Sequence, residues 1–227
     1  MPEVKKAELI QGIVYMPSPV RIDYHGEPDS LTQGWLFTYA VATPGVKSAT
    51  NTTVRLGRDD VLQPDGILRL LPESGGQAQA DKKGLLAGPP ELVFEVAASS
   101  ASIDVNAKKT SCRRGGVQEY VVWRTLDEAL DWWTLDDDDY SPLSPDEDGI
   151  HRSRVFPGLW LDVAALLRGE GKRVIEILSQ GLASEDHAKI AAKFPGSMPP
   201  GVPPKDAEFV APSANGASQN SPARSIG

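Results

Sequence analysis

Cysteine is almost absent from this chain of 227 residues, because Cys112 is the only one. An internal disulfide is therefore excluded. A reactive thiol would need a base nearby, and no histidine lies close to Cys112 in the sequence. We interpret Cys112 as a residue that packs on a helix.

Long apolar runs are also missing, since no stretch approaches the roughly 20 residues of a membrane span. The first six residues lead into polar sequence without the apolar centre of a signal peptide. We therefore expect a cytoplasmic protein that does not have a membrane as its partner.

Several motifs that carry chemistry are absent. His25, His151 and His187 lie far apart and have no metal-ligand spacing, so we assign none of them to zinc. No glycine-rich phosphate loop is present, and Ser99 and Ser100 have no Gly-x-Ser-x-Gly elbow around them. These absences argue against nucleotide hydrolysis and against serine-hydrolase chemistry.

The net charge of −8 by itself argues against a nucleic-acid partner, but the acidity is local. Residues 125–151 contain ten Asp and Glu and no Lys or Arg, which leaves the rest of the chain weakly basic. We interpret the acidic segment as a solvated loop that aids solubility. A phosphate-binding face elsewhere on the protein stays compatible with the sequence.

Apolar patterning predicts one α/β domain over residues 1–194, followed by a disordered tail over 195–227 that is rich in Pro, Gly, Ser and Ala. We expect strands at 7–16 (one strand or a hairpin, with Gly12 at the bend), 46–56, 67–71, 92–97 and 119–123, with 129–135 paired to 150–155 across the acidic loop. We expect helices at 29–41, 105–114, 161–167, 174–182 and 186–193, with Asp104 as the N-cap of the second, and a flexible loop at 72–88.

Two carboxylates and a lysine stand out against this framework. Asp65 follows Gln63-Pro64 at the start of a strand, and Glu95 lies inside the apolar run 92–97, where a charge is costly unless it is paired or metal-bound. Neighbouring strands can bring both acids to one edge of a sheet, where they could hold Mg²⁺, with Mn²⁺ as a substitute. Lys108, on the next helix, is a candidate to stabilise negative charge on a phosphate. The set predicts a nuclease.

Each residue also has a simpler interpretation. Taken alone, Asp65 is more often a turn residue after proline. Glu95 could form a buried ion pair with Arg113 or Lys108. Lys108 and Lys109 are both typical of a solvated helix surface, and the sequence does not decide between them. Glu8, in the first strand, either joins the cluster or faces solvent.

At these residues the chain resembles a large bacterial family classed as restriction endonucleases, the Uma-type branch of the PD-(D/E)XK nuclease superfamily. The resemblance runs from Glu8 to about Lys193. It is carried by the order and spacing of the segments Glu8-Leu9-Ile10-Gln11-Gly12, Gln63-Pro64-Asp65, Glu95-Val96-Ala97-Ala98-Ser99, Asp104-x-x-x-Lys108, Gly116-Val117-Gln118-Glu119-Tyr120 and Phe156-Pro157-Gly158-Leu159-Trp160.

The resemblance implies a restriction-endonuclease-like core, in which helices flank a central mixed β-sheet. It makes Asp65 and Glu95 metal ligands. In the nuclease hypothesis that follows, Glu8 would orient a ligand or water. The chain departs from the superfamily motif at Ala97, where the lysine two residues after the second acid would fall. Lys108 is the position that matches a lysine moved to the following helix.

The leading hypothesis is therefore a Mg²⁺-dependent endonuclease that hydrolyses phosphodiester bonds of DNA. The alternative is a catalytically inactive module that keeps the nuclease fold for binding, which the weak basicity favours. We expect a homodimer, because cutting both strands of a duplex needs two sites related by symmetry. Trp132 and Trp133 are candidates either for that interface or for the core of a hairpin.

Overall fold

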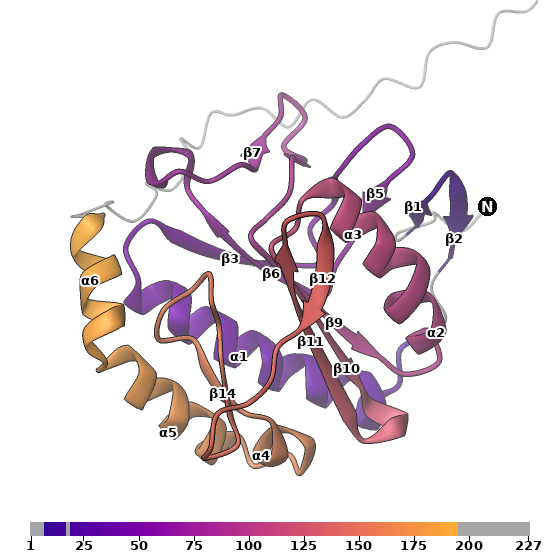
Figure 1. The fold of residues 1–227 in the computed structure, drawn as a ribbon. Helices are drawn as coiled ribbons and strands as arrows, with labels where there is room; N and C mark the ends of the chain where they lie inside the picture. Colours follow the sequence, from indigo (N-terminus) through magenta and orange to yellow (C-terminus); the bar gives the residue numbers. More distant parts are fainter. Residues whose placement is uncertain (1–6, 17–18, 195–227) are drawn as a thin grey trace, which may run out of the picture. The chain divides into compact units, whose positions relative to one another are not determined.

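A mixed six-stranded sheet forms the centre of this computed structural model, which describes residues 7–16 and 19–194 (Figure 1). The predicted tail at 195–227 lies outside the described residues. In spatial order the strands are β12 (Asp139–Pro142), β11 (Ala129–Asp136), β10 (Glu119–Arg124), β9 (Leu92–Ala97), β6 (Gly66–Leu70) and β3 (Val46–Thr50).

The two middle strands, β9 and β10, run parallel, while every other pair in this sheet is antiparallel. A parallel pair needs a crossover connection, usually helical. Here the crossover consists of α2 (Ala101–Ile103), the π-helical turn η3 (Asp104–Lys108) and α3 (Lys109–Gly115). The helix ends where the sequence predicts, because Gly116 adopts a left-handed conformation as its C-cap.

Helices cover both faces of β9, which is buried at every position as its apolar run predicts. Phe94 and Val96 face α1 (Glu27–Ala42), which contributes Trp35 and Leu36 to the same cluster. Val93 and Ala97 face the α2–α3 crossover. Because side chains alternate along a strand, Glu95 points towards the crossover and not towards α1.

A second six-stranded sheet, made of shorter strands, brings the N-terminal hairpin close to the crossover (Figure 1). The predicted hairpin is confirmed, with β1 and β2 paired around Gln11 and Gly12. Gln11 Nε2 donates to the carbonyl of Ala107, which ties the hairpin to η3. In spatial order the strands of this sheet are β2 (Ile13–Tyr15), β1 (Glu8–Ile10), β5 (Val61–Leu62), β4 (Val54–Arg55), β8 (Leu86–Ala87) and β7 (Gln79–Ala80).

Three expected elements were wrong. The strand expected over 46–56 divides into β3 and β4, because Asn51 takes a positive φ of 49° and turns the chain from one sheet to the other. Residues 72–88 contain β7, β8 and a 3₁₀ turn η2 (Pro72–Ser74), so they are not simply a loop. Asp104 is not an N-cap, because α2 already begins at Ala101.

The pairing expected between 129–135 and 150–155 was also wrong. β11 pairs with β12 as a tight hairpin, and β13 (Ile150–Arg152) pairs with β14 (Trp160–Asp162). The acidic segment is therefore not a continuous loop, because it contains β11, β12 and the 3₁₀ turn η4 (Thr125–Asp127). Most of its acidic side chains are nevertheless exposed to solvent, as expected. Several of its carboxylates pair with arginines, as Asp131 does with Arg124.

The two tryptophans of β11 pack within the fold. Trp132 is buried against Trp35, and Trp133 stacks on Tyr120 on the opposite face of the sheet. Their hairpin-core interpretation is the correct one. The expected homodimer therefore takes no support from them and stays a prediction.

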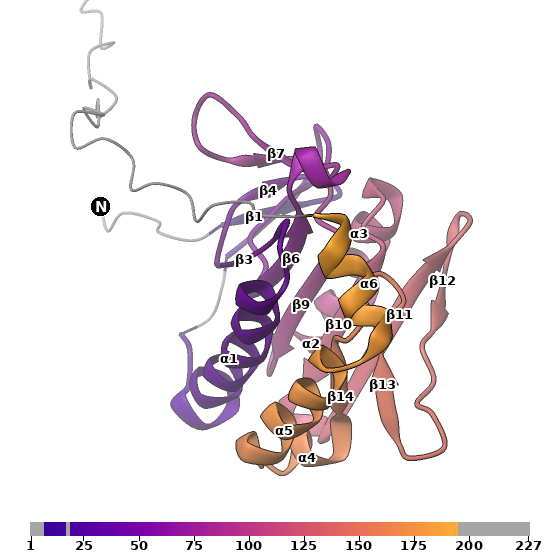
Figure 2. The ribbon, with the colours of Figure 1, turned by 90° about the vertical axis from the view of Figure 1, so that its left-hand side faces the viewer.

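The C-terminal helices α4 (Val163–Leu167), α5 (Gly171–Leu182) and α6 (Glu185–Lys193) follow β14, as predicted to within a few residues (Figure 2). Residues of α4 and α5 complete the cluster that α1 begins. No helix in the described residues has both the length and the apolarity to cross a membrane.

Two glycines within helices are expected to respond to alanine in opposite directions. A Cβ at Gly181 of α5 would lie 2.2 Å from the carbonyl oxygen of Gly158 and 2.8 Å from the Trp160 ring. Gly181→Ala should therefore cost about 3 kcal/mol, since backbone must move. A Cβ at Gly34 of α1 meets nothing within 4 Å, so Gly34→Ala should stabilise by about 0.5–1 kcal/mol. Urea unfolding of both variants measures the contrast, and equal effects would contradict it.

Candidate active site

Asp65 immediately precedes β6, beside the end of β9. The register pairs Gly66 with Phe94, so Asp65 comes next to Glu95 on the neighbouring strand. Its Oδ2 accepts a hydrogen bond of 2.9 Å from the backbone N–H of Val96. The side chain is buried, with 3% exposure of the residue, and it reaches across the sheet. It therefore does more than shape the local turn after Pro64.

Glu95 and Lys108 form a buried ion pair. Lys108 Nζ lies 2.8 Å from Glu95 Oε1, and the residues are exposed by only 2% and 3% respectively. Arg113, the other partner considered, lies near Asp139 at the surface. The ion-pair interpretation of Glu95 is confirmed, with Lys108 as the partner.

The two adjacent lysines, Lys108 and Lys109, have different surroundings. Lys109 Nζ lies 4.3 Å from the centre of the Trp133 ring, in a cation–π contact. Lys108 instead points into the acidic cluster from η3. A π-helical turn inserts one extra residue per turn, and such turns occur frequently at functional sites.

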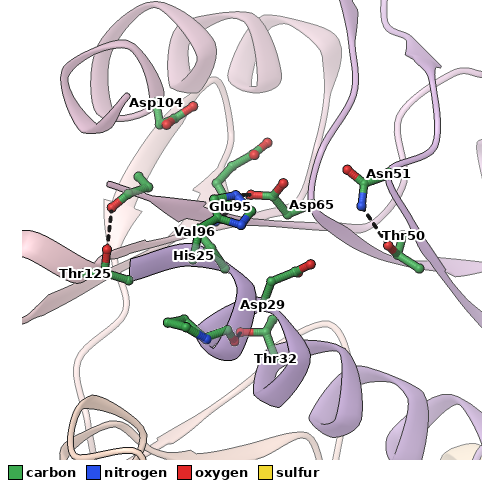
Figure 3. Close-up of polar contacts among 12 residues, drawn as sticks. His25, Asp29, Thr32, Thr50, Asn51, Asp65, Glu95, Val96, Asp104 and Thr125 are labelled. Atoms are coloured by element: carbon green, nitrogen blue, oxygen red, sulfur yellow. Dashed lines mark hydrogen bonds and ion pairs between the residues drawn. The ribbon is translucent and has the colours of Figure 1, made fainter. Parts of the chain in front are cut away.

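Two further carboxylates complete the cluster. Glu8 Oε1 lies 2.9 Å from Lys108 Nζ and accepts a hydrogen bond of 2.6 Å from the N–H of Gln63. Asp104 Oδ1 lies 3.8 Å from the same ammonium, from a position four residues earlier on the helical segment. Figure 3 shows Asp65 and Glu95 on adjacent strands, with Asp104 on the helical segment next to them.

Negative charge exceeds positive charge in this buried cluster. Burial raises the pKa of Glu95 well above its usual range; Lys108 opposes the shift, and Asp65, Asp104 and Glu8 add to it. Burial likewise raises the pKa of Asp104. For Lys108 burial acts to lower the pKa, but Glu95, Glu8 and Asp104 outweigh it and hold the pKa well above the usual value. Lys108 therefore stays protonated, and the cluster favours an additional cation.

The donors at the site suit a hard divalent ion. Glu95 Oε1 accepts no hydrogen bond of regular geometry from the described residues, although it is fully buried and ion-paired. The described residues contain no group of three or more His, Cys, Asp or Glu that would enclose a metal. A pair of carboxylates such as Asp65 and Glu95 matches Mg²⁺, which retains several waters and is usually held by one or two carboxylates plus substrate phosphate.

Sequence reasoning missed two residues at this site. Asp104 lies four residues before Lys108, and this helical spacing could have placed both on one face. His25 Nε2 lies 3.3 Å from Asp65 Oδ2, in the π-helical turn η1 (Ile22–Gly26) that leads into α1 (Figure 3). No local signal in the sequence joins His25 to a residue 40 positions away.

A mixed sheet flanked by helices is the architecture that the sequence predicted for this chain. The fold is similar to the crystal structure of a protein described as a putative nuclease belonging to DUF820 from Anabaena variabilis. The TM-score is 0.51 at 15% sequence identity, over 74% of this chain and 94% of that chain. The predicted restriction-endonuclease-like core is thereby confirmed.

The chain belongs to the Uma2 family, described as "Putative restriction endonuclease", whose sequence model matches residues 1–164. That range covers all five cluster residues and the His25 turn. No curated protein matches the chain.

Proposed function

We propose that this protein is a divalent-metal-dependent nuclease that hydrolyses phosphodiester bonds of DNA, with Mg²⁺ as the ion and Mn²⁺ as a substitute. The observation that carries the proposal is the buried Lys108 ammonium, in contact with both Glu95 and Glu8 beside Asp65. These residues come from separate elements, and a charge cluster of this kind is costly to bury unless it serves a purpose. Family membership and the nuclease-like fold support the same conclusion.

Asp65 and Glu95 would hold the ion, because they present carboxylates from adjacent strands on one side of the sheet. When bound, the ion would polarise the phosphate and make a coordinated water more acidic. The motif then corresponds to that of the PD-(D/E)XK superfamily, with its lysine supplied by η3.

The chain's own residues supply the remaining functions. Lys108 is the group that would stabilise the extra negative charge on the phosphate in the transition state, and its raised pKa keeps it cationic for that role. Glu8, from β1 of the second sheet, contacts Lys108 and is itself anchored by the N–H of Gln63. Glu8 is thus a positioning residue for the lysine.

Asp65→Asn tests the proposal most directly. Plasmid and single-stranded DNA are incubated with the wild type and the variant, in Mg²⁺, in Mn²⁺ and in excess EDTA. We expect metal-dependent cutting by the wild type that EDTA abolishes and that falls on the order of 10³-fold in the variant. Wild-type protein that neither cuts DNA nor takes up metal would instead favour an inactive binding module.

The DNA products of this assay also test the oligomeric state of the protein. Cutting of both strands at one place would require two sites acting together, as in the homodimer that we propose. Nicking without linear product, together with a monomeric mass in sedimentation, would argue against that assembly.

A further inference from the structure

Two π-helical turns occur in the described part of the chain, and both deliver a side chain to the same cluster. One, η3, contributes Lys108 and Asp104, while the other, η1, contributes His25. π-turns are rare and cost regular hydrogen bonding, and they concentrate at functional sites. The second turn therefore points to a role for His25 that goes beyond linking the hairpin to α1.

His25 contacts Asp65 Oδ2, the carboxylate oxygen that already accepts a hydrogen bond from a backbone N–H of β9. Asp65 Oδ2 accepts the N–H of Val96 at 2.9 Å and lies 3.3 Å from His25 Nε2. The two donors come from different elements, β9 and η1. A carboxylate is planar and rigid, so holding Oδ2 from two directions also fixes where Oδ1 lies.

Neighbouring bonds hold the turn itself in place. Thr125 Oγ1 donates at 2.7 Å to the carbonyl of Tyr24, the residue before His25 in the chain. Gln33 Nε2, from α1, donates to the backbone carbonyl of Asp65 at 2.8 Å. Both His25 and the backbone of Asp65 are thus anchored to structure outside β6.

We propose that His25 is a positioning residue of the metal site: its Nε2–H donates to Asp65 Oδ2 and, with the N–H of Val96, orients the Asp65 carboxylate for the ion. Partners that hydrogen-bond to metal ligands in this way typically change metal affinity by about 10- to 100-fold. A neutral imidazole with its proton on Nε2 is sufficient for this role. The inference rests on the proposed function, because it requires Asp65 to bind an ion.

Titration of Mn²⁺ alone into the full chain, followed by calorimetry, tests the role without any need for catalysis. We expect His25→Ala to weaken Mn²⁺ binding by about tenfold or more. His25→Gln, which can also donate a hydrogen bond from its side chain, should recover most of that loss. Tyr24→Ala, on the same turn but with an exposed side chain, is the matched control and should bind as the wild type does. Thermal unfolding of each metal-free variant checks that the fold is retained.

The outcomes separate this inference from the proposed function. Binding that is lost in Asp65→Asn but unchanged in His25→Ala would overturn the positioning role and leave the metal site intact. Equal losses in His25→Ala and Tyr24→Ala would also overturn it, because a general loosening of η1 would then be responsible. A wild type that binds no Mn²⁺ would overturn both proposals together.

Discussion

Glu95→Gln is expected to abolish metal-dependent DNA cleavage, with a loss on the order of 10³-fold or more, while the protein remains folded. Glutamine keeps the size of the side chain but removes the anionic ligand. It also removes a carboxyl group whose pKa is raised by burial and by the neighbouring Asp65, Asp104 and Glu8, so the cost of burial falls. Plasmid nicking rates and Mn²⁺ calorimetry measure the two consequences separately.

Glu119→Gln is the matched control for this prediction. Glu119 is buried on the neighbouring strand β10, and burial raises its pKa too. However, its carboxylate accepts hydrogen bonds from Ser153 Oγ and from the backbone N–H of Arg154, away from the cluster. Glu119→Gln should therefore cut DNA at close to the wild-type rate. Equal losses in the two variants would show that general disturbance of the sheet, and not loss of a ligand, is responsible.

Lys108→Ala is expected to lower the cleavage rate by roughly 10²- to 10³-fold, with a smaller effect on metal binding. In the proposed mechanism the Lys108 ammonium would stabilise the charge of the transition state, whereas the Asp65 and Glu95 carboxylates would hold the metal ion. Lys109→Ala should stay within about threefold of the wild type, because Lys109 lies over Trp133 and away from the cluster. A larger loss in Lys109→Ala than in Lys108→Ala would contradict the assignment.

Stability must be followed in the same series. Removing Lys108 leaves the buried Glu95 without its cation, which typically costs about 3–5 kcal/mol. The double variant Glu95→Gln/Lys108→Met should regain much of that stability while remaining inactive. If the double variant were both stable and fully active, the pair would be a structural ion pair only.

Sequence alone was enough for the apolar strands and for the unusual acid. The strand at 92–97 is buried at every position, and its interrupting Glu95 was expected to need a partner. The end of the crossover helix at Gly115-Gly116 was equally predictable from the sequence. These features are local, because they depend on side-chain periodicity and on the conformational freedom of glycine.

Strand pairing beyond the core was less predictable. The segments β11 to β14 all have strand character, but the partner of each depends on the turns that connect them and on which faces are buried. The tight β11–β12 hairpin excluded the longer-range pairing that the sequence suggested. The division of 46–56 between two sheets likewise depends on a single turn at Asn51.

The sequence by itself determined that this protein has a buried acid in a central strand, a second acid before a neighbouring strand and a nearby lysine. Only the tertiary structure decided that Lys108 and not Lys109 enters the cluster, that Glu8 and Asp104 join it, and that His25 contacts Asp65. The reason is physical: a π-turn rotates the side chains that follow it relative to a regular helix, and ion pairs between distant segments depend on packing that no local pattern encodes.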